Sequence, residues 1–208
     1  IMGLFDSVKQ ALGVAAEADA TREGDPEALF GLSTAEVTME AELDVAPADE
    51  AELCLSGVDS TACTDARDEV ADVLDAGESE TGTVFEFRTD AHGYDWVVLA
   101  DTEFEDLVTS VHFAADTMQE SGFGSRLLAA AFPFERDGTV AYWLYSFRRG
   151  SYYPFVPTGN RNHDSSTEFK LESVLDSELT IEEDKEYWYP MWPEGDARPW
   201  GRPLEPGE

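Results

Sequence analysis

Basic residues are scarce in this sequence. The 208 residues include 13 Lys and Arg against 45 Asp and Glu, a formal net charge of −32, and only three of the basic residues are Lys. The phosphates of a nucleic acid require basic patches, so we expect no nucleic-acid partner. The acids are spread along the whole chain, and exposed like charges repel unless salt screens them. This pattern is typical of a cytoplasmic protein of a salt-loving microbe; the alternative is an acidic ligand of a basic partner.

Cysteine, histidine and long apolar runs are also scarce. Eight residues separate Cys54 from Cys63, which is not the spacing of a redox or zinc motif, so we interpret both as reduced, partly buried hydrophobic residues. The three histidines show neither i, i+4 pairing nor a metal-ligand spacing with Cys or Asp. No apolar run reaches the roughly 18 residues of a transmembrane helix. We therefore expect no cofactor, no metal ion and no membrane span.

The chain length suits one domain with appendages. We expect an amphipathic helix in residues 1–16, a polar linker in 17–26 and a single α+β domain in 27–208. The helical stripe of the first segment consists of Leu4, Phe5, Val8 and Leu12. This helix either docks on its own domain or contacts a membrane or a partner protein.

Hydrophobic periodicity predicts the elements of the α+β domain. Alternating apolar residues predict strands at 33–43, 51–57, 83–88, 94–100, 126–136 and 139–148, and an extended segment at 151–159. Helical spacing predicts helices at 26–30, at 60–77 with Gly77 as the stop, and at 103–122 with Gly122 as the stop. Residues 167–175 favour a strand, with a helix as the open alternative, and the tail from about 186 is expected to be irregular. Hairpins mixed with two or three helices indicate an antiparallel sheet packed on one side by helices.

One segment, 145-YSFRRGSYYPFVP-157, combines aromatic and basic residues. The candidate binding residues in it are Arg148, Arg149, Tyr152, Tyr153 and Phe155. Arg and Tyr are enriched at binding hot spots, so the segment predicts a patch for a protein or an anionic head group. The alternative is a core strand and turn whose arginines pair with nearby carboxylates.

The sequence carries no strong catalytic motif. The strand and third glycine of a dinucleotide fold are missing around Gly122-Phe123-Gly124. The helix at 103–122 places His112 opposite most of its apolar stripe, and His92 and His163 fall in predicted loops. A metal-assisted hydrolase that uses His112 or His163 with nearby carboxylates is the alternative function.

Several segments, taken in order, resemble the PspA-associated protein family PspAB. They are His92–Val98, Asp106–Val108, Glu120–Leu128 and Arg148–Pro157, with further similarity in the opening Met2-Gly3, at Leu29–Thr38 and in the Trp-Pro tail. The resemblance spans nearly the whole chain. It implies a non-enzymatic accessory or adaptor beside PspA, the coiled-coil membrane-remodelling protein of envelope stress, with no established catalytic residues. A PspA-like partner and a peripheral place at the inner face of the membrane are therefore expectations.

Overall fold

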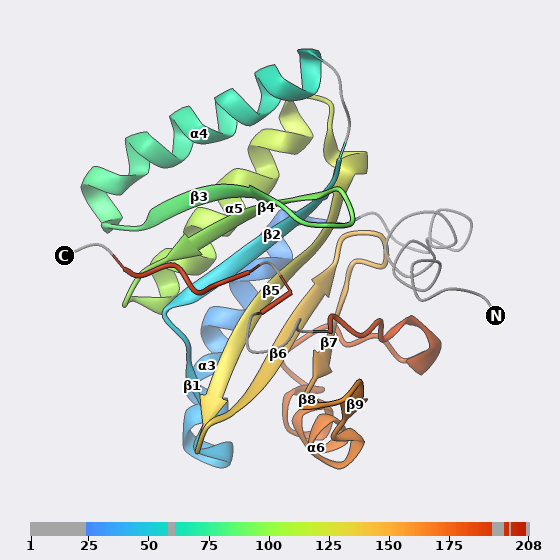
Figure 1. Ribbon diagram of the computed structural model, residues 1–208. Helices are drawn as coiled ribbons and strands as arrows, with labels where there is room; N and C mark the ends of the chain where they lie inside the picture. Colours follow the sequence, from blue (N-terminus) through green and yellow to red (C-terminus); the bar gives the residue numbers. More distant parts are fainter. Residues whose placement is uncertain (1–23, 58–60, 193–197, 200, 207–208) are drawn as a thin grey trace.

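A computed structural model describes residues 24–57, 61–192, 198–199 and 201–206. The expected helix in residues 1–16 and most of the expected linker lie outside these residues. The described part forms a seven-stranded antiparallel sheet and a small two-stranded sheet, with four α-helices (Figure 1). The α+β prediction is confirmed.

The large sheet has the strand order β3-β4-β2-β5-β6-β7, and β1 pairs with β5. Its strands are β1 (Ala46–Pro47), β2 (Glu50–Ser56), β3 (Val84–Thr89), β4 (Tyr94–Ala100), β5 (Leu127–Arg136), β6 (Thr139–Ser146) and β7 (Ser151–Phe155). The small sheet pairs β8 (Pro157–Gly159) with β9 (Asn162–His163). The predicted hairpins β3–β4 and β5–β6 are confirmed. Asp137 and Gly138 both have positive φ in the second one, as tight hairpin turns require.

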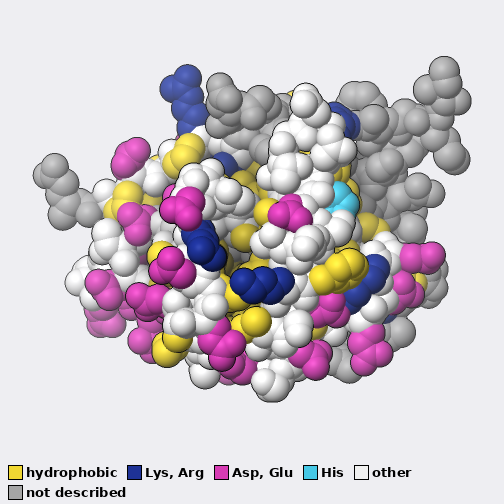
Figure 2. All heavy atoms as spheres, turned by 90° about the horizontal axis from the view of Figure 1, so that it is seen from below, with side chains coloured by type: hydrophobic (Ala, Val, Ile, Leu, Met, Phe, Trp, Pro, Cys, Tyr) yellow, Lys and Arg dark blue, Asp and Glu magenta, His cyan; other side chains and the backbone are white. Residues whose placement is uncertain are grey.

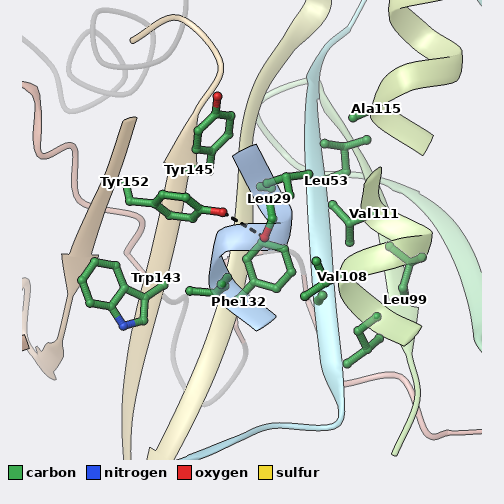
Figure 3. Close-up of a cluster of buried hydrophobic side chains, with 14 of the residues drawn as sticks. Leu29, Leu53, Leu99, Val108, Val111, Ala115, Phe132, Trp143, Tyr145 and Tyr152 are labelled. Atoms are coloured by element: carbon green, nitrogen blue, oxygen red, sulfur yellow. Dashed lines mark hydrogen bonds between the residues drawn. The ribbon is translucent and has the colours of Figure 1, made fainter. Parts of the chain in front are cut away.

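The α-helices are α3 (Gly31–Leu43), α4 (Thr61–Thr81), α5 (Phe104–Glu120) and α6 (Ser165–Leu175), and the 3-10 helices are η2 (Pro26–Phe30), η3 (Gly124–Arg126) and η4 (Lys185–Tyr187). In Figure 1, α3 and α5 lie behind the large sheet. The main hydrophobic cluster fills this interface, where Val108 and Val111 of α5 meet Leu53, Leu99 and neighbouring sheet residues (Figure 3). The predicted helices at 26–30 and 103–122 are confirmed, and the side chain of Asp25 caps η2.

The prediction of a strand at 33–43 is wrong, because these residues belong to α3. Val37, Met39, Ala41 and Leu43 alternate with polar residues, but Val37 is 66% exposed and Ala41 is exposed too. The residues that α3 buries are Leu32, Ala35, Met39 and Leu43. Their spacing of three and four residues is helical.

Two further boundaries differ from the sequence expectations. Residues 167–175 are part of α6, so the helical alternative holds there. Helix α4 passes Gly77 and continues to Thr81, and the chain leaves it at Gly82, whose φ is +82°. Positive φ is the usual geometry of a helix-ending glycine, so Gly82 is the residue that ends α4. The predicted end at Gly77 is five residues too early.

The opposite, outer face of the sheet carries a second hydrophobic cluster, which includes Cys54, Trp96 and Tyr153. Residues of the C-terminal tail pack on it; they are Trp188, Tyr189, Met191, Trp192 and Leu204. In Figure 1 this tail, drawn in red, crosses in front of the sheet. The described residues of the tail are largely irregular, as predicted, apart from η4 and an isolated bridge between Arg198 and Gly201.

Candidate functional site

Three of the segments with family resemblance lie at the same end of the large sheet. Strands β4 and β5 begin there, β6 ends there and β7 begins there. The pairing register runs across this end from Trp96 to Cys54, Ala129, Ser146 and Ser151. We call the three connections at this end, residues 90–93, 121–126 and 147–150, the motif end of the sheet.

The first connection is organised by one carboxylate. Asp90 Oδ1 accepts hydrogen bonds from the backbone N–H groups of His92 (2.8 Å) and Tyr94 (3.0 Å), and Oδ2 accepts from Trp96 Nε1 (3.1 Å). Gly93 has a φ of +82°, which side chains rarely adopt. The His-Gly-Tyr-Asp-Trp segment therefore shapes a tight loop and fixes the indole of Trp96.

The second connection turns the chain from α5 into β5. Gly122 ends α5 with a φ of +81°, which confirms the prediction that it caps this helix. A side chain at Gly124 would lie only 3.0 Å from Cγ of Gln119. Gln119, in the last turn of α5, in turn donates a hydrogen bond to the carbonyl of Gly24 (3.0 Å). This bond ties the first described residue to the end of α5, next to the second connection.

The third connection contains the Arg-Arg pair. The backbone N–H groups of Arg149 and Gly150 both donate to the carbonyl of Ser146 (3.2 and 2.7 Å), which closes a tight turn. Arg148 is partly exposed, and its Nη2 donates to the carbonyl of Ser125 (2.6 Å). This bond ties the third connection to the second one.

Arg149 points inward. Its side chain is 8% exposed, and Nε and Nη2 donate to the two carboxylate oxygens of Glu182 at 2.9 and 3.3 Å. The guanidinium also lies 3.7 Å from the ring centre of Tyr187. Burial alone would raise the pKa of Glu182, but hydrogen bonds from Arg149, Asp184 N–H and Ser151 hold this pKa below its ordinary value. For Arg149 the structure therefore shows the second interpretation given in the sequence analysis, an arginine that pairs with a carboxylate of its own protein.

The aromatic candidates Tyr152, Tyr153 and Phe155 are buried, with 1%, 1% and 4% of their surface exposed. Tyr152 faces the helix side, where its hydroxyl donates to the carbonyls of Ala28 and Leu29 at 3.2 and 3.4 Å (Figure 3). Tyr153 and Phe155 belong to the outer cluster. Among the five candidates Arg148 is thus the side chain that a partner could reach directly, and a binding role for the set remains a prediction.

An open hollow of about 730 Å³ adjoins the inward side of the third connection. Arg149, Ser151 and residues 176–184 line it. Its carboxylates are Asp176, Glu178, Glu182, Glu183 and Asp184. With five carboxylates around one paired arginine, the hollow repels an anionic head group and suits a cation. Sequence reasoning missed it because nothing in residues 176–184 indicates that the chain returns to the β7 edge.

The three histidines differ in exposure and in the side chains that they contact. His92 is exposed, whereas His112 is 7% exposed because η2 covers that flank of α5. Nε2 of His112 lies 3.2 Å from Glu27 Oε1, and Nδ1 of His163 lies 2.7 Å from Glu168 Oε2. Within the described residues, no group of three or more His, Cys, Asp and Glu side chains is placed to hold a metal ion.

The comparison with known families covers nearly the whole chain. A family model described as PspA associated protein B matches residues 2–202. The chain belongs to the PspA associated protein B family. No curated protein and no solved structure matches it. None of the helices in the described part is long and apolar enough to span a membrane.

Proposed function

We propose that this PspA associated protein B family member is a non-catalytic accessory of a PspA-type envelope stress response. In this proposal it binds a protein partner through the motif end. The observation that carries it is the family match over nearly the whole chain, because the family is named for an association with another protein. The sequence carries no strong catalytic motif that competes with this interpretation.

The geometry of the motif end supports a contact by arginine. Arg126 and Arg148 are both partly exposed there, in the second and third connections. The aromatic side chains of the same segment fold inward and make the turn rigid, so less conformational entropy is lost when a partner orders an arginine there. A guanidinium offers several donors in a fixed plane and is common at binding hot spots. The proposal thus predicts an acidic or carbonyl-rich surface on the partner.

Copurification in molar salt tests the proposal. The bait is the full chain, and the prey is the PspA-type protein of the same organism. Arg126→Ala/Arg148→Ala should lose most of the partner. The matched control is Arg136→Ala/Arg161→Ala, which also removes two exposed or partly exposed charges. The two pairs also resemble each other in their hydrogen bonds, because Arg136 donates to the backbone carbonyl of Leu43 and Arg148 donates to that of Ser125.

Two outcomes would count against the proposal. If the wild-type chain does not recover the PspA-type protein, the proposed partner is wrong. Equal losses in the two variant pairs would show that net charge, rather than the motif end, determines recovery. Circular dichroism of each variant ensures that only folded chains are compared.

We also propose that residues 2–16 contact a membrane surface peripherally, through Leu4, Phe5, Val8 and Leu12. These residues lie outside the described part, so the proposal rests on their helical spacing. An acidic protein and anionic lipids repel, so the binding would be mostly apolar and strengthened by salt. Deletion of residues 2–14 should abolish sedimentation with vesicles and leave the fold intact. Loss of the fold would instead show that the helix is structural.

A further inference from the structure

Two glutamates are buried on the outer face of the sheet. Glu50 and Glu52 of β2 are 2% and 0% exposed. They alternate along the strand with residues of the helix-side cluster, so both point to the same side as Cys54 of the outer cluster. Glu52 pairs with Val98 on one side and Ala131 on the other. These carboxyl groups therefore lie in an apolar row, where an unpaired polar group is costly.

An arginine of the C-terminal tail reaches this pair. Arg198 Nε forms an ion pair with Glu50 Oε1, and Nη2 donates to Glu135 Oε1 at 3.0 Å. The Arg198 side chain is only 14% exposed. The backbone of Arg198 also exchanges two hydrogen bonds of 2.9 Å with Gly201. The tail is thus fixed at the point where its arginine enters the sheet face.

Other charged and titratable groups face the same place from the neighbouring strands. Arg88 of β3 contributes a positive charge and Tyr142 of β6 contributes a phenol. Burial raises the pKa of Tyr142 to about 12 although Arg198 opposes the shift. Burial, and then the charge of Glu50, raise the pKa of Glu52 well above its ordinary value.

Polar atoms remain unsatisfied on both sides of this contact. In the described part of the chain, neither carboxyl oxygen of Glu52 has a hydrogen-bond partner, although both are buried. Nη1 of Arg198 is likewise buried without an acceptor. Glu52 therefore has unused acceptor capacity beside a guanidinium whose Nη1 lacks an acceptor among the described residues.

We propose that Glu50, Glu52 and Tyr142 form a guanidinium-binding site on the outer face of the sheet, and that Arg198 fills it as a latch for the C-terminal tail. Glu50 supplies the charge, and the neutral carboxyl group of Glu52 supplies a further acceptor oxygen. A planar guanidinium matches such a set better than an ammonium does. When the latch is released, the side chains of Met191, Trp192 and Leu204 lose their anchor, and the outer cluster becomes accessible. This inference does not rest on the proposed function.

Chemical rescue tests the site in the full-length protein. Arg198→Ala should raise amide hydrogen exchange in residues 188–192 and 201–206 by about tenfold or more, because the tail opens locally while the sheet stays folded. Millimolar methylguanidine should restore protection in this variant, since it replaces the missing group. The same concentration of methylamine should not.

Two control variants make the rescue specific. Glu50→Gln/Arg198→Ala lacks the charged acceptor and should not respond to methylguanidine. Arg88→Ala removes a guanidinium that bonds to the carbonyl of Arg202 but lies on another strand, and it too should not respond. Rescue of either control, or unchanged exchange in Arg198→Ala, overturns the proposal. If Arg198→Ala folds but is too unstable for exchange measurements, methylguanidine must raise its Tm without raising that of the double variant, and failure to do so also overturns the proposal.

Discussion

The adjacent residues Arg148 and Arg149 have opposite environments because they occupy successive positions of a tight turn. Arg148 reaches across the surface to the carbonyl of Ser125, whereas Arg149 enters the protein and meets Glu182. Sequence reasoning could find the pair, but could not decide between a surface patch and an inward ion pair. The deciding residue, Glu182, lies 33 positions away along the chain. Its approach to β7 depends on the tertiary fold.

Replacing Arg149 should cost much more stability than replacing Arg148. Arg149→Ala leaves the carboxylate of Glu182 buried without its main partner, so we expect a loss of about 3–5 kcal/mol in the free energy of unfolding. Arg148→Ala removes the hydrogen bond to the carbonyl of Ser125 at a partly exposed site, for which we expect about 1 kcal/mol. Urea unfolding at constant molar KCl measures both. Equal costs would contradict an inward Arg149.

Glu52 should make the protein less stable as the pH rises. Its pKa is raised in the folded state from an ordinary value of 4.5, so the native protein retains a proton that the unfolded chain releases. Stability from this group is therefore complete below pH 4.5 and falls towards the folded-state pKa, by up to about 1.4 kcal/mol per pH unit.

Glu52→Gln isolates this effect because the amide cannot ionise. The variant should match the wild type at low pH and become progressively more stable than it above pH 4.5. Glu50→Gln is the matched control: it should be less stable than the wild type at neutral pH, since it removes the buried ion pair between Glu50 and Arg198. A constant difference between Glu52→Gln and the wild type across the pH range would contradict a neutral Glu52.

At the scale of elements, the sequence predicts the hairpins and the helices at 26–30 and 103–122 well, but it mistakes the helix α3 for a strand. The turn Asp137-Gly138 and the periodicity of 103–122 each have one interpretation. In 33–43, by contrast, the same residues satisfy both a period of two and a helical period, and only burial against α5 and the sheet decides between them. For α6 a signal was present: Asp164 caps the helix by accepting from the N–H groups of Ser166 and Thr167.

The end of α4 can be tested with two glycines. Gly77 lies inside the helix, and an added Cβ would meet no atom within 4 Å, so Gly77→Ala should stabilise the protein by about 0.5–1 kcal/mol. Gly82→Ala should destabilise it by about 1–2 kcal/mol, because its φ is +82°. Urea unfolding measures both changes. A loss of stability in Gly77→Ala would indicate that the helix ends there, as the sequence first suggested.

At the scale of the whole molecule, the acidic charge is a property of the surface. Figure 2 views the protein from below the β5–β6 turn, and the acidic side chains are dispersed across that face with hydrophobic groups near its centre. The two buried ion pairs of Arg149 and Arg198 use only a few of the 45 carboxylates. Most of the net charge of −32 therefore repels itself through solvent.

Salt should therefore stabilise the fold. Raising KCl from physiological to molar concentration shortens the screening length from about 8 Å to about 3 Å, which weakens repulsion between surface carboxylates. We expect Tm to increase, by about 2–4 °C for each kcal/mol gained. Sucrose of equal osmolality provides the control for excluded-solute effects. A Tm that is insensitive to KCl, or increases equally in sucrose, would contradict the electrostatic explanation.

The central claim is that the motif end binds a protein partner of the PspA type, and its most direct test is an equilibrium Kd in molar KCl. We predict that Arg126→Ala/Arg148→Ala raises Kd for the PspA-type protein by about tenfold or more, which corresponds to at least about 1.4 kcal/mol. The control pair Arg136→Ala/Arg161→Ala should leave Kd within about twofold of the wild-type value, or about 0.4 kcal/mol. No measurable binding by the wild-type chain, or the same change in Kd for both pairs, would contradict the claim.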